Sequence, residues 1–309
     1  MPEEKKISDT LLRQLSQLTD ELENFEEIAL RLKPEPGEIP KLAGIDISGT
    51  IIPLAGPIGG DHIIYLDFDQ RYDLNARIQK AQQKGQSQIA AKLEEMKQTA
   101  GVLLADVSGH RITDAVLAAM LHQAFLLGAL YELDMFGTIT TRLFENINNR
   151  FFRSSSVRKF LTMIYGEIEV GGRFRFISAG HHPPLIFSNE FDRFVEIHPD
   201  LLITYPPIGT MPSKTDPDRS RRPSVLGYKD KYTINELKLM SPGDILLLYT
   251  DGLKEHEGAG GSYFPERLEN KIREFKARSA RHILDEIGRD LLDFGPPADD
   301  VSLVLIKKS

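Results

Sequence analysis

The 309-residue sequence contains no cysteine. This absence excludes disulfide bonds, cysteine nucleophiles, zinc fingers and iron–sulfur clusters, because each of them needs a thiol or thiolate. Carboxylates, histidines and backbone carbonyls remain as candidate metal ligands. A chain without cysteine also suits a reducing compartment such as the cytoplasm.

Long apolar runs are missing as well. The first residues, MPEEKKISDT, are polar and lack the apolar segment of a secretion signal. No later stretch contains the run of about 18 consecutive apolar residues that indicates a membrane-spanning helix. The sequence therefore predicts a cytoplasmic protein that does not use a membrane.

The sequence has no surplus of positive charge. It contains 38 Lys and Arg against 45 Asp and Glu, which gives a net charge of −7. Such a chain has no long-range attraction for the phosphate backbone of nucleic acids, so we expect no nucleic-acid partner. With 41% hydrophobic and 27% charged residues, the composition is typical of a folded globular protein.

The N-terminal part is predicted to be one amphipathic helix. Between residues 8 and 32, apolar residues recur at steps of three and four, and Ser8 or Asp9 is placed to cap the helix start. Prolines at 34, 36 and 40 end the pattern. We expect this helix either to pack on its own domain, to pair with a second copy, or to dock a regulatory protein. Residues 1–40 thus form a helix and linker, and residues 41–309 form the main domain.

From residue 41 onward, short apolar runs predict many strands. They are LAGIDISGTII, HIIYLDF, GVLLAD, FLTMIYGEIEV, RFRFISAG, PLIFSN, FVEI, ILLLYTD and VSLVLIKK, with helices expected at 73–99, 112–131, 135–152 and 265–293. The charged, proline-containing stretch 211–232 is predicted to be an exposed loop. This order of elements favours an α+β fold in which helices pack on antiparallel sheets.

Acidic residues stand at the ends of several of these apolar runs. Asp106 follows VLLA, Asp251 follows ILLLYT, Asp299 and Asp300 precede VSLVLI, and Asp61 lies between Gly-Gly and HIIYL. An ionised carboxylate beside a buried strand is unfavourable unless it is paired or binds a cation. Few basic residues neighbour these aspartates, so a hard divalent ion such as Mg²⁺ or Mn²⁺ is the expected partner.

Each of these motifs also has a simpler explanation. Gly-Gly-Asp is typical of a turn with a capping aspartate, Tyr-Thr-Asp-Gly of a strand end, and Asp299-Asp300 of a loop. Their joint occurrence at strand ends beside glycines favours the metal site.

Six motifs resemble a known family. GGD at 59–61, ADVSGH at 105–110, SAGHHPPL at 178–185, PPIG at 206–209, SPGDILLLYTDGLKE at 241–255 and DDVSLVLI at 299–306 occur in the order and rough spacing of the metal-dependent (PPM-type) serine/threonine phosphatases. The SpoIIE/RsbU-like branch is the most similar one. The resemblance covers residues 41–309.

The resemblance implies a four-layer α-β-β-α sandwich of two antiparallel sheets, with two Mn²⁺ or Mg²⁺ ions at one end. By motif, Asp106 would bridge both ions and the carbonyl of Val107 would add a ligand. Asp251 and Asp299 would hold one ion, and Asp61 would bind the other directly or through water. The metals would activate a water molecule for attack on phosphorus, so that no protein nucleophile is needed.

Two residues next to the second motif are further candidates. His110 is placed either to protonate the leaving serine or threonine oxygen or to cap the helix predicted from residue 112. Arg111 stands where the branch usually has glycine, and either contacts phosphate or fits a tight turn poorly. His181 and His182 are interpreted as structural turn residues.

These residues predict a phosphoprotein phosphatase, and by resemblance the substrate is an anti-sigma-factor antagonist in bacterial partner-switching signalling. The alternative is a catalytically quiet member that acts as a binding module, which Arg111 and the altered Gly-Gly-Asp context would suit. A diguanylate-cyclase function is disfavoured, since His62 and Ile63 follow Gly-Gly-Asp where that activity needs acidic and phenylalanine residues.

Overall fold

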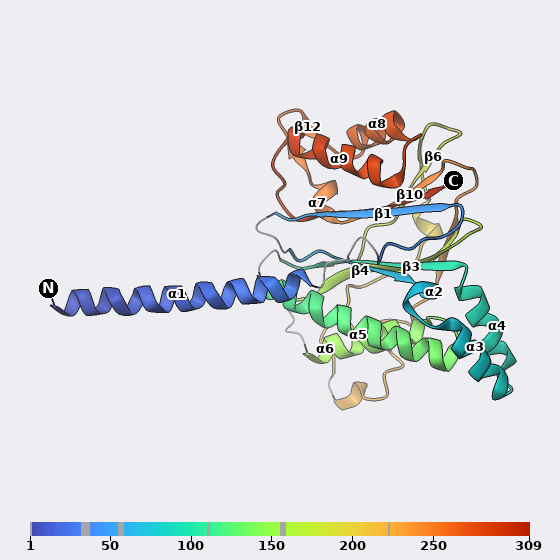
Figure 1. Ribbon diagram of the computed structural model, residues 1–309, viewed down its shortest axis with the longest axis horizontal. Helices are drawn as coiled ribbons and strands as arrows, with labels where there is room; N and C mark the ends of the chain where they lie inside the picture. The colour runs from blue at the N-terminus through green and yellow to red at the C-terminus, as the bar shows by residue number, and fades with distance from the viewer. Residues whose placement is uncertain (1, 32–37, 55–58, 110–111, 155–158, 222) are drawn as a thin grey trace.

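Two β-sheets stack face to face and carry helices on both outer surfaces, while one long helix projects away from them (Figure 1). This computed structural model describes residues 2–31, 38–54, 59–109, 112–154, 159–221 and 223–309. The arrangement confirms the predicted four-layer α-β-β-α sandwich with an N-terminal helix.

The first sheet has five strands, all antiparallel to their neighbours. In spatial order they are β1 (Ile45–Ile52), β13 (Val301–Lys308), β10 (Ile245–Tyr249), β6 (Leu185–Ser188) and β7 (Arg193–Val195). Helices α8 (Glu266–Phe275) and α9 (Ala280–Phe294) cover its outer face. Strands β10 and β13 read as nearly continuous apolar runs because this sheet is covered on both faces.

The second sheet has six strands. They are β2 (His62–Asp67), β3 (Thr99–Val107), β4 (Leu161–Glu169), β5 (Arg173–Ala179), β8 (Thr204–Tyr205) and, paired with β5, β9 (Asn235–Lys238). Helices α5 (Ile112–Phe136) and α6 (Thr141–Ser154) lie beneath it (Figure 1). Strand β8 runs parallel to β5, whereas the sequence predicted antiparallel pairing throughout, because a local apolar pattern carries no information on strand direction.

The remaining elements are the long N-terminal helix and several short helices, strands and turns. They are α1 (Pro2–Leu30), α2 (Phe68–Arg71), α3 (Leu74–Gln83), α4 (Ser87–Met96), α7 (Asp251–Lys254), β11 (Glu257–Gly258), β12 (Gly261–Ser262) and the 3₁₀ turns Pro199–Leu201 and Arg219–Arg221.

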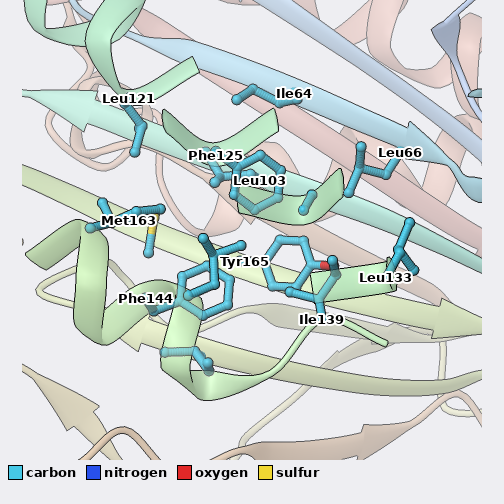
Figure 2. Packing of buried hydrophobic residues seen from close by; sticks show 14 of the residues in the cluster. Ile64, Leu66, Leu103, Leu121, Phe125, Leu133, Ile139, Phe144, Met163 and Tyr165 are labelled. Carbon is cyan, nitrogen blue, oxygen red and sulfur yellow. The ribbon is translucent and has the colours of Figure 1, made fainter. Parts of the chain in front are cut away.

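Strand β3 shows how the core is divided between layers. Val102 and Leu104 pack between the two sheets, whereas Leu103 and Ala105 face the helices. On the helix side, the ring centroid of Tyr165 lies 5.2 Å from that of Phe125 and 5.0 Å from that of Phe144. Figure 2 shows these three side chains among their neighbours. Both faces of the strand are buried, which explains its continuous apolar run.

Several elements differ from the sequence-based expectation. Helix α5 continues to Phe136 and α6 begins only at Thr141, so the predicted bounds 112–131 and 135–152 were wrong where the two helices meet. Helix α1 begins at Pro2, so neither Ser8 nor Asp9 caps it. The stretch 73–99 contains two helices, separated at Gly85, whose positive φ of 69° ends the first. The stretch 211–232 is not simply an exposed loop. Lys229 is buried and its Nζ lies 3.0 Å from Glu145 of α6, a contact between distant residues that no local pattern reveals.

One described helix segment, Asp114–Phe136, is long and apolar enough to cross a membrane by length and composition alone. Polar residues such as His122 and Glu132 lie among its apolar residues, so the segment contains no uninterrupted apolar run of that length. Leu121, Phe125 and Leu133 are fully buried against the sheet. Only 33% of this segment is buried, and Leu127, Tyr131 and Met135 on the same helix are exposed, so this packing accounts for one face of α5 alone.

Candidate metal centre

Four of the predicted ligands meet at one end of the sandwich. His62 lies opposite Ala105 in the antiparallel pair β2–β3, so Asp61 and Asp106 are neighbours at the edge of the six-stranded sheet. Tyr249 lies opposite Leu303 in the pair β10–β13, so Asp251 and Asp299 emerge together from the five-stranded sheet. The register of two strand pairs therefore places two carboxylates from each sheet at the same end.

Hydrogen bonds connect the two sheets at this end. Thr250 Oγ1 donates to Asp61 Oδ2 at 2.8 Å, and the backbone N–H of Ser302 donates to Thr250 Oγ1 at 2.9 Å. Thr250 is fully buried, so this chain of bonds is shielded from solvent and fixes the orientation of the Asp61 carboxylate.

Asp300 serves a different purpose from its neighbour. Its Oδ1 accepts the backbone N–H of Leu54, and its Oδ2 accepts that of Gly60, both at 2.7 Å. Within the described residues, the Asp299 carboxylate instead accepts the N–H of Asp300 alone, at 2.8 Å. Asp300 thus positions the backbone before Asp61, whereas Asp299 retains oxygen lone pairs for another partner.

The glycine before Asp61 allows a close backbone approach. A Cβ atom at Gly60 would lie 2.5 Å from the carbonyl oxygen of Gly109 and 2.9 Å from that of Val107. Any side chain would therefore push this segment away from the turn after β3. Glycine brings Asp61 next to the Val107 carbonyl, which the sequence predicted as a ligand.

The carboxylates at this end repel one another. Burial, followed by the charges of Asp251 and Asp299, raises the pKa of Asp106 to about 7. Burial and the charge of Asp106 raise the pKa of Asp61 well above its ordinary value. Burial and Asp299 also raise the pKa of Asp251. Among the described residues, no lysine or arginine forms an ion pair with any of them.

The donor chemistry of this cluster fits a hard divalent cation. Carboxylate and carbonyl oxygens are the ligands that Mg²⁺ and Mn²⁺ prefer, and positive charge would relieve the mutual repulsion. Within the described ranges, no three histidine, aspartate or glutamate groups are arranged closely enough to hold a metal ion as they stand. The assignment of individual ligands therefore stays a prediction.

The remaining residues considered in the sequence either lie outside the described part of the chain or make contacts with neighbouring side chains. His110 and Arg111 lie outside the described residues. His181 is buried, and its Nδ1 lies 2.9 Å from Thr162 Oγ1, in agreement with a structural role. The ring of His182 stacks parallel to that of Tyr249 at a centroid distance of 5.6 Å.

Sequence reasoning missed an ion pair next to the site. Asp114, in the first turn of α5, is fully buried and pairs with Lys159 Nζ. Lys159 Nζ also donates to the carbonyl oxygen of Ser108 at 3.3 Å, which ties the turn after β3 to the start of α5. The only available signal was an acidic residue at the start of an apolar helix, which also fits ordinary dipole stabilisation.

A family model described as Stage II sporulation protein E (SpoIIE) matches residues 97–309. The chain belongs to the SpoIIE family. This confirms the resemblance on which the predicted branch depended. The matched residues include all strands of the six-stranded sheet except β2 and all strands of the first sheet except β1.

Individual relatives agree with the family. The chain is 23% identical over 217 residues to the phosphoserine phosphatase RsbU of Bacillus subtilis, covering 69% of this chain and 56% of RsbU. It is 27% identical over 156 residues to the phosphoserine phosphatase RsbP of the same organism, covering 50% of this chain and 33% of RsbP. The chain thus spans about half of one relative and a third of the other.

A solved structure resembles the whole arrangement. The SiaA-PP2C domain of Pseudomonas aeruginosa superimposes with a TM-score of 0.64 at 14% sequence identity, covering 96% of this chain and 98% of that domain. This SpoIIE-family chain therefore has the fold of a PP2C domain.

Proposed function

We propose that this SpoIIE-family chain is a Mn²⁺- or Mg²⁺-dependent phosphatase of phosphoserine and phosphothreonine in proteins. The observation that carries the proposal is the convergence of Asp61, Asp106, Asp251 and Asp299 at one end of the sandwich. No lysine or arginine in the described part of the chain forms an ion pair with them. Similarity to RsbU and RsbP, both named phosphoserine phosphatases, supports the same reaction.

The roles of this chain's own residues follow from their positions. Asp106 would bridge two cations, the Val107 carbonyl would add a ligand, Asp251 and Asp299 would hold one ion, and Asp61 would bind the other directly or through water. Thr250 keeps the Asp61 carboxylate turned toward the cluster. Two such cations supply the activation of water and neutralise charge on the phosphoryl oxygens.

The decisive experiment replaces a ligand without changing its shape. Asp106→Asn and Asp251→Asn should each lower the Mn²⁺-dependent hydrolysis of p-nitrophenyl phosphate and of a phosphoserine peptide by about a thousandfold or more, since each would lose a metal ligand. Asp293→Asn, an exposed residue of α9, is the matched control and should retain the wild-type rate. Wild-type turnover by both ligand variants would refute the proposal.

The proposed substrate is a phosphorylated anti-sigma-factor antagonist in a cytoplasmic partner-switching pathway, as the family resemblance implies. Release of phosphate from such a purified antagonist, compared with an unrelated phosphoprotein, tests this point. The competing proposal is a catalytically quiet binding module. Calorimetric Mn²⁺ binding without any turnover would favour that module instead.

We further propose that helix α1 associates with a second copy of itself. Six of its apolar side chains are each at least 45% exposed: Leu11, Leu12, Leu15, Leu18, Leu22 and Ile28. The helix projects away from the sandwich in Figure 1, and pairing would remove this apolar stripe from water. Leu15→Glu with Leu18→Glu should yield a monomer by light scattering, whereas Gln14→Glu with Gln17→Glu should not. A monomeric wild type would contradict self-association and leave a regulatory protein as the partner.

A further inference from the structure

A groove with a volume of about 590 Å³ lies between the β6–β7 hairpin and the start of α8. Its apolar wall includes the partly exposed side chains of Leu185, Phe194, Ile197 and Phe264. None of the residues that line it belongs to the proposed ligand set. The groove is therefore a feature separate from the metal centre.

The groove begins next to the metal centre. Leu185 lies opposite Leu247 in the pair β6–β10, so the segment before β6 runs beside the end of β10, which leads directly to Asp251. The ring of Tyr249 stacks on that of His182 at a centroid distance of 5.6 Å and on that of Phe264 at 5.4 Å. Stacked rings thus connect the neighbourhood of Asp251 to the groove wall.

The groove also carries unpaired negative charge. Glu196 and Glu266 line it and are exposed, and neither forms an ion pair within the described part of the chain. Glu269 differs, because its Oε2 accepts the backbone N–H of Phe194 at 2.8 Å and its Oε1 pairs with Arg273 at 2.5 Å. The bond from Glu269 occupies the backbone N–H of Phe194 in the edge strand β7. An added strand could therefore not use this donor, and the groove would bind a peptide through its side chains.

We propose that this groove binds the polypeptide next to the phosphorylated residue and selects a segment that combines apolar side chains with lysine or arginine. The inference rests on the proposed phosphatase function. Apolar side chains match the wall, and cationic side chains match Glu196 and Glu266. An extended chain advances about 3.3 Å per residue, so the ring-to-ring steps of 5.6 and 5.4 Å correspond to about three residues at most. The segment would therefore begin about four residues from a phosphoserine bound beside the first ring.

The test compares synthetic phosphoserine peptides that differ only in this segment. One set carries alternating leucine and lysine, a second carries leucine and glutamate, and a third carries serine and lysine, each placed four residues before or four residues after the phosphoserine. Phosphate release gives kcat and KM for each peptide. In one of the two placements, the wild type should prefer the leucine–lysine peptide over the leucine–glutamate peptide by about tenfold in kcat/KM, mainly through KM.

Charge reversal identifies the surface responsible. In a Glu196→Lys, Glu266→Lys double variant, the preference should fall to about one or invert, because like charges now meet. Glu236→Lys changes an exposed glutamate on β9, in the other sheet, and should keep the wild-type preference. Each preference compares two peptides on the same enzyme, so a general loss of rate does not affect it.

A second variant tests the apolar part. Ile197→Ser should reduce the preference for leucine–lysine over serine–lysine peptides by about fivefold, since it removes apolar contact area from the groove wall. Equal kcat/KM for all peptides in both placements, or an unchanged preference in the double variant, would overturn the groove assignment alone. Failure of the wild type to hydrolyse any peptide or p-nitrophenyl phosphate would instead contradict the proposed phosphatase function.

Discussion

Two regions of the six-stranded sheet each hold a carboxylate whose pKa is raised to about 7, and their surroundings differ. At the metal centre, Asp106 lies opposite Thr162 of β4, and further along the same strand Glu167 lies opposite Gly101. Burial raises the pKa of both Asp106 and Glu167 to about 7. The difference between the two regions lies in the neighbouring groups.

Glu167 is stabilised by its own chain. Tyr165 Oη donates to Glu167 Oε1 at 2.8 Å, and both this bond and the charge of Arg175 on β5 lower the pKa that burial raises. Around Asp106 the neighbouring charges are Asp251, Asp299 and Asp300, and all of them raise its pKa. A lone buried acid can thus be accommodated by one hydroxyl and one distant cation, whereas a group of acids needs positive charge from outside the chain.

The largest expected effect is stabilisation by metal at the acidic cluster alone. At a Mn²⁺ concentration of about 100 times its Kd, the free energy of unfolding of the wild type should rise by about 2.7 kcal/mol, and EDTA should reverse the rise. Glu167→Gln should respond like the wild type, because Glu167 lies away from the cluster. Asp106→Asn should lose most of the response. Equal stabilisation of all three proteins in thermal denaturation would remove the distinction between the two regions.

The second effect concerns pH and Glu167. Its pKa is raised from an ordinary value of 4.5 to about 7, so the folded state holds this proton more tightly than the unfolded state. The contribution to stability is therefore fully present below pH 4.5 and is lost as the pH rises through about 7, by about 2 to 3 kcal/mol between pH 5 and pH 8. Glu167→Gln should remove this loss in urea unfolding at pH 5 and pH 8. Glu236→Gln is the control, and an unchanged pH dependence in Glu167→Gln would argue against the assignment.

The smallest effect concerns the hydrogen bonds that orient Asp61. Thr250→Val keeps the shape of the side chain but leaves Asp61 Oδ2 and the N–H of Ser302 without this hydroxyl, which should cost about 1 kcal/mol of stability. The Mn²⁺ affinity measured by calorimetry should fall about tenfold, as is typical when a group that orients a ligand is lost. Thr250→Ser retains the hydroxyl and should behave like the wild type. Loss of affinity in Thr250→Ser as well would point to packing instead.

Local patterns were sufficient for those parts of the fold and site that depend on nearby residues. The apolar runs before Asp106 and Asp251 correspond to β3 and β10, since burial on both faces produces an uninterrupted apolar sequence. Strand β3 continues past its run to Val107, so Asp106 lies inside the strand rather than after it. The layered architecture and the role expected of each ligand came from the order of six motifs rather than from periodicity. That order is informative because strands distant in the sequence must deliver aspartates to one place.

Long-range contacts could not be predicted in this way. Three such contacts join segments far apart in the sequence. They are the ion pair of Lys229 with Glu145, the parallel pairing of β8 with β5, and the hydrogen bond from Thr250 to Asp61. The different roles of Asp299 and Asp300 also escaped the sequence, because two adjacent aspartates differ only in which backbone groups the fold brings to them.

The two backbone bonds of Asp300 have a consequence for how this family can vary. One carboxylate holds both Leu54 and Gly60, so the chain leaving β1 and the chain entering β2 are clamped to the same point. We therefore expect an insertion between Leu54 and Gly60 to leave Asp61 in place as long as both bonds to Asp300 persist.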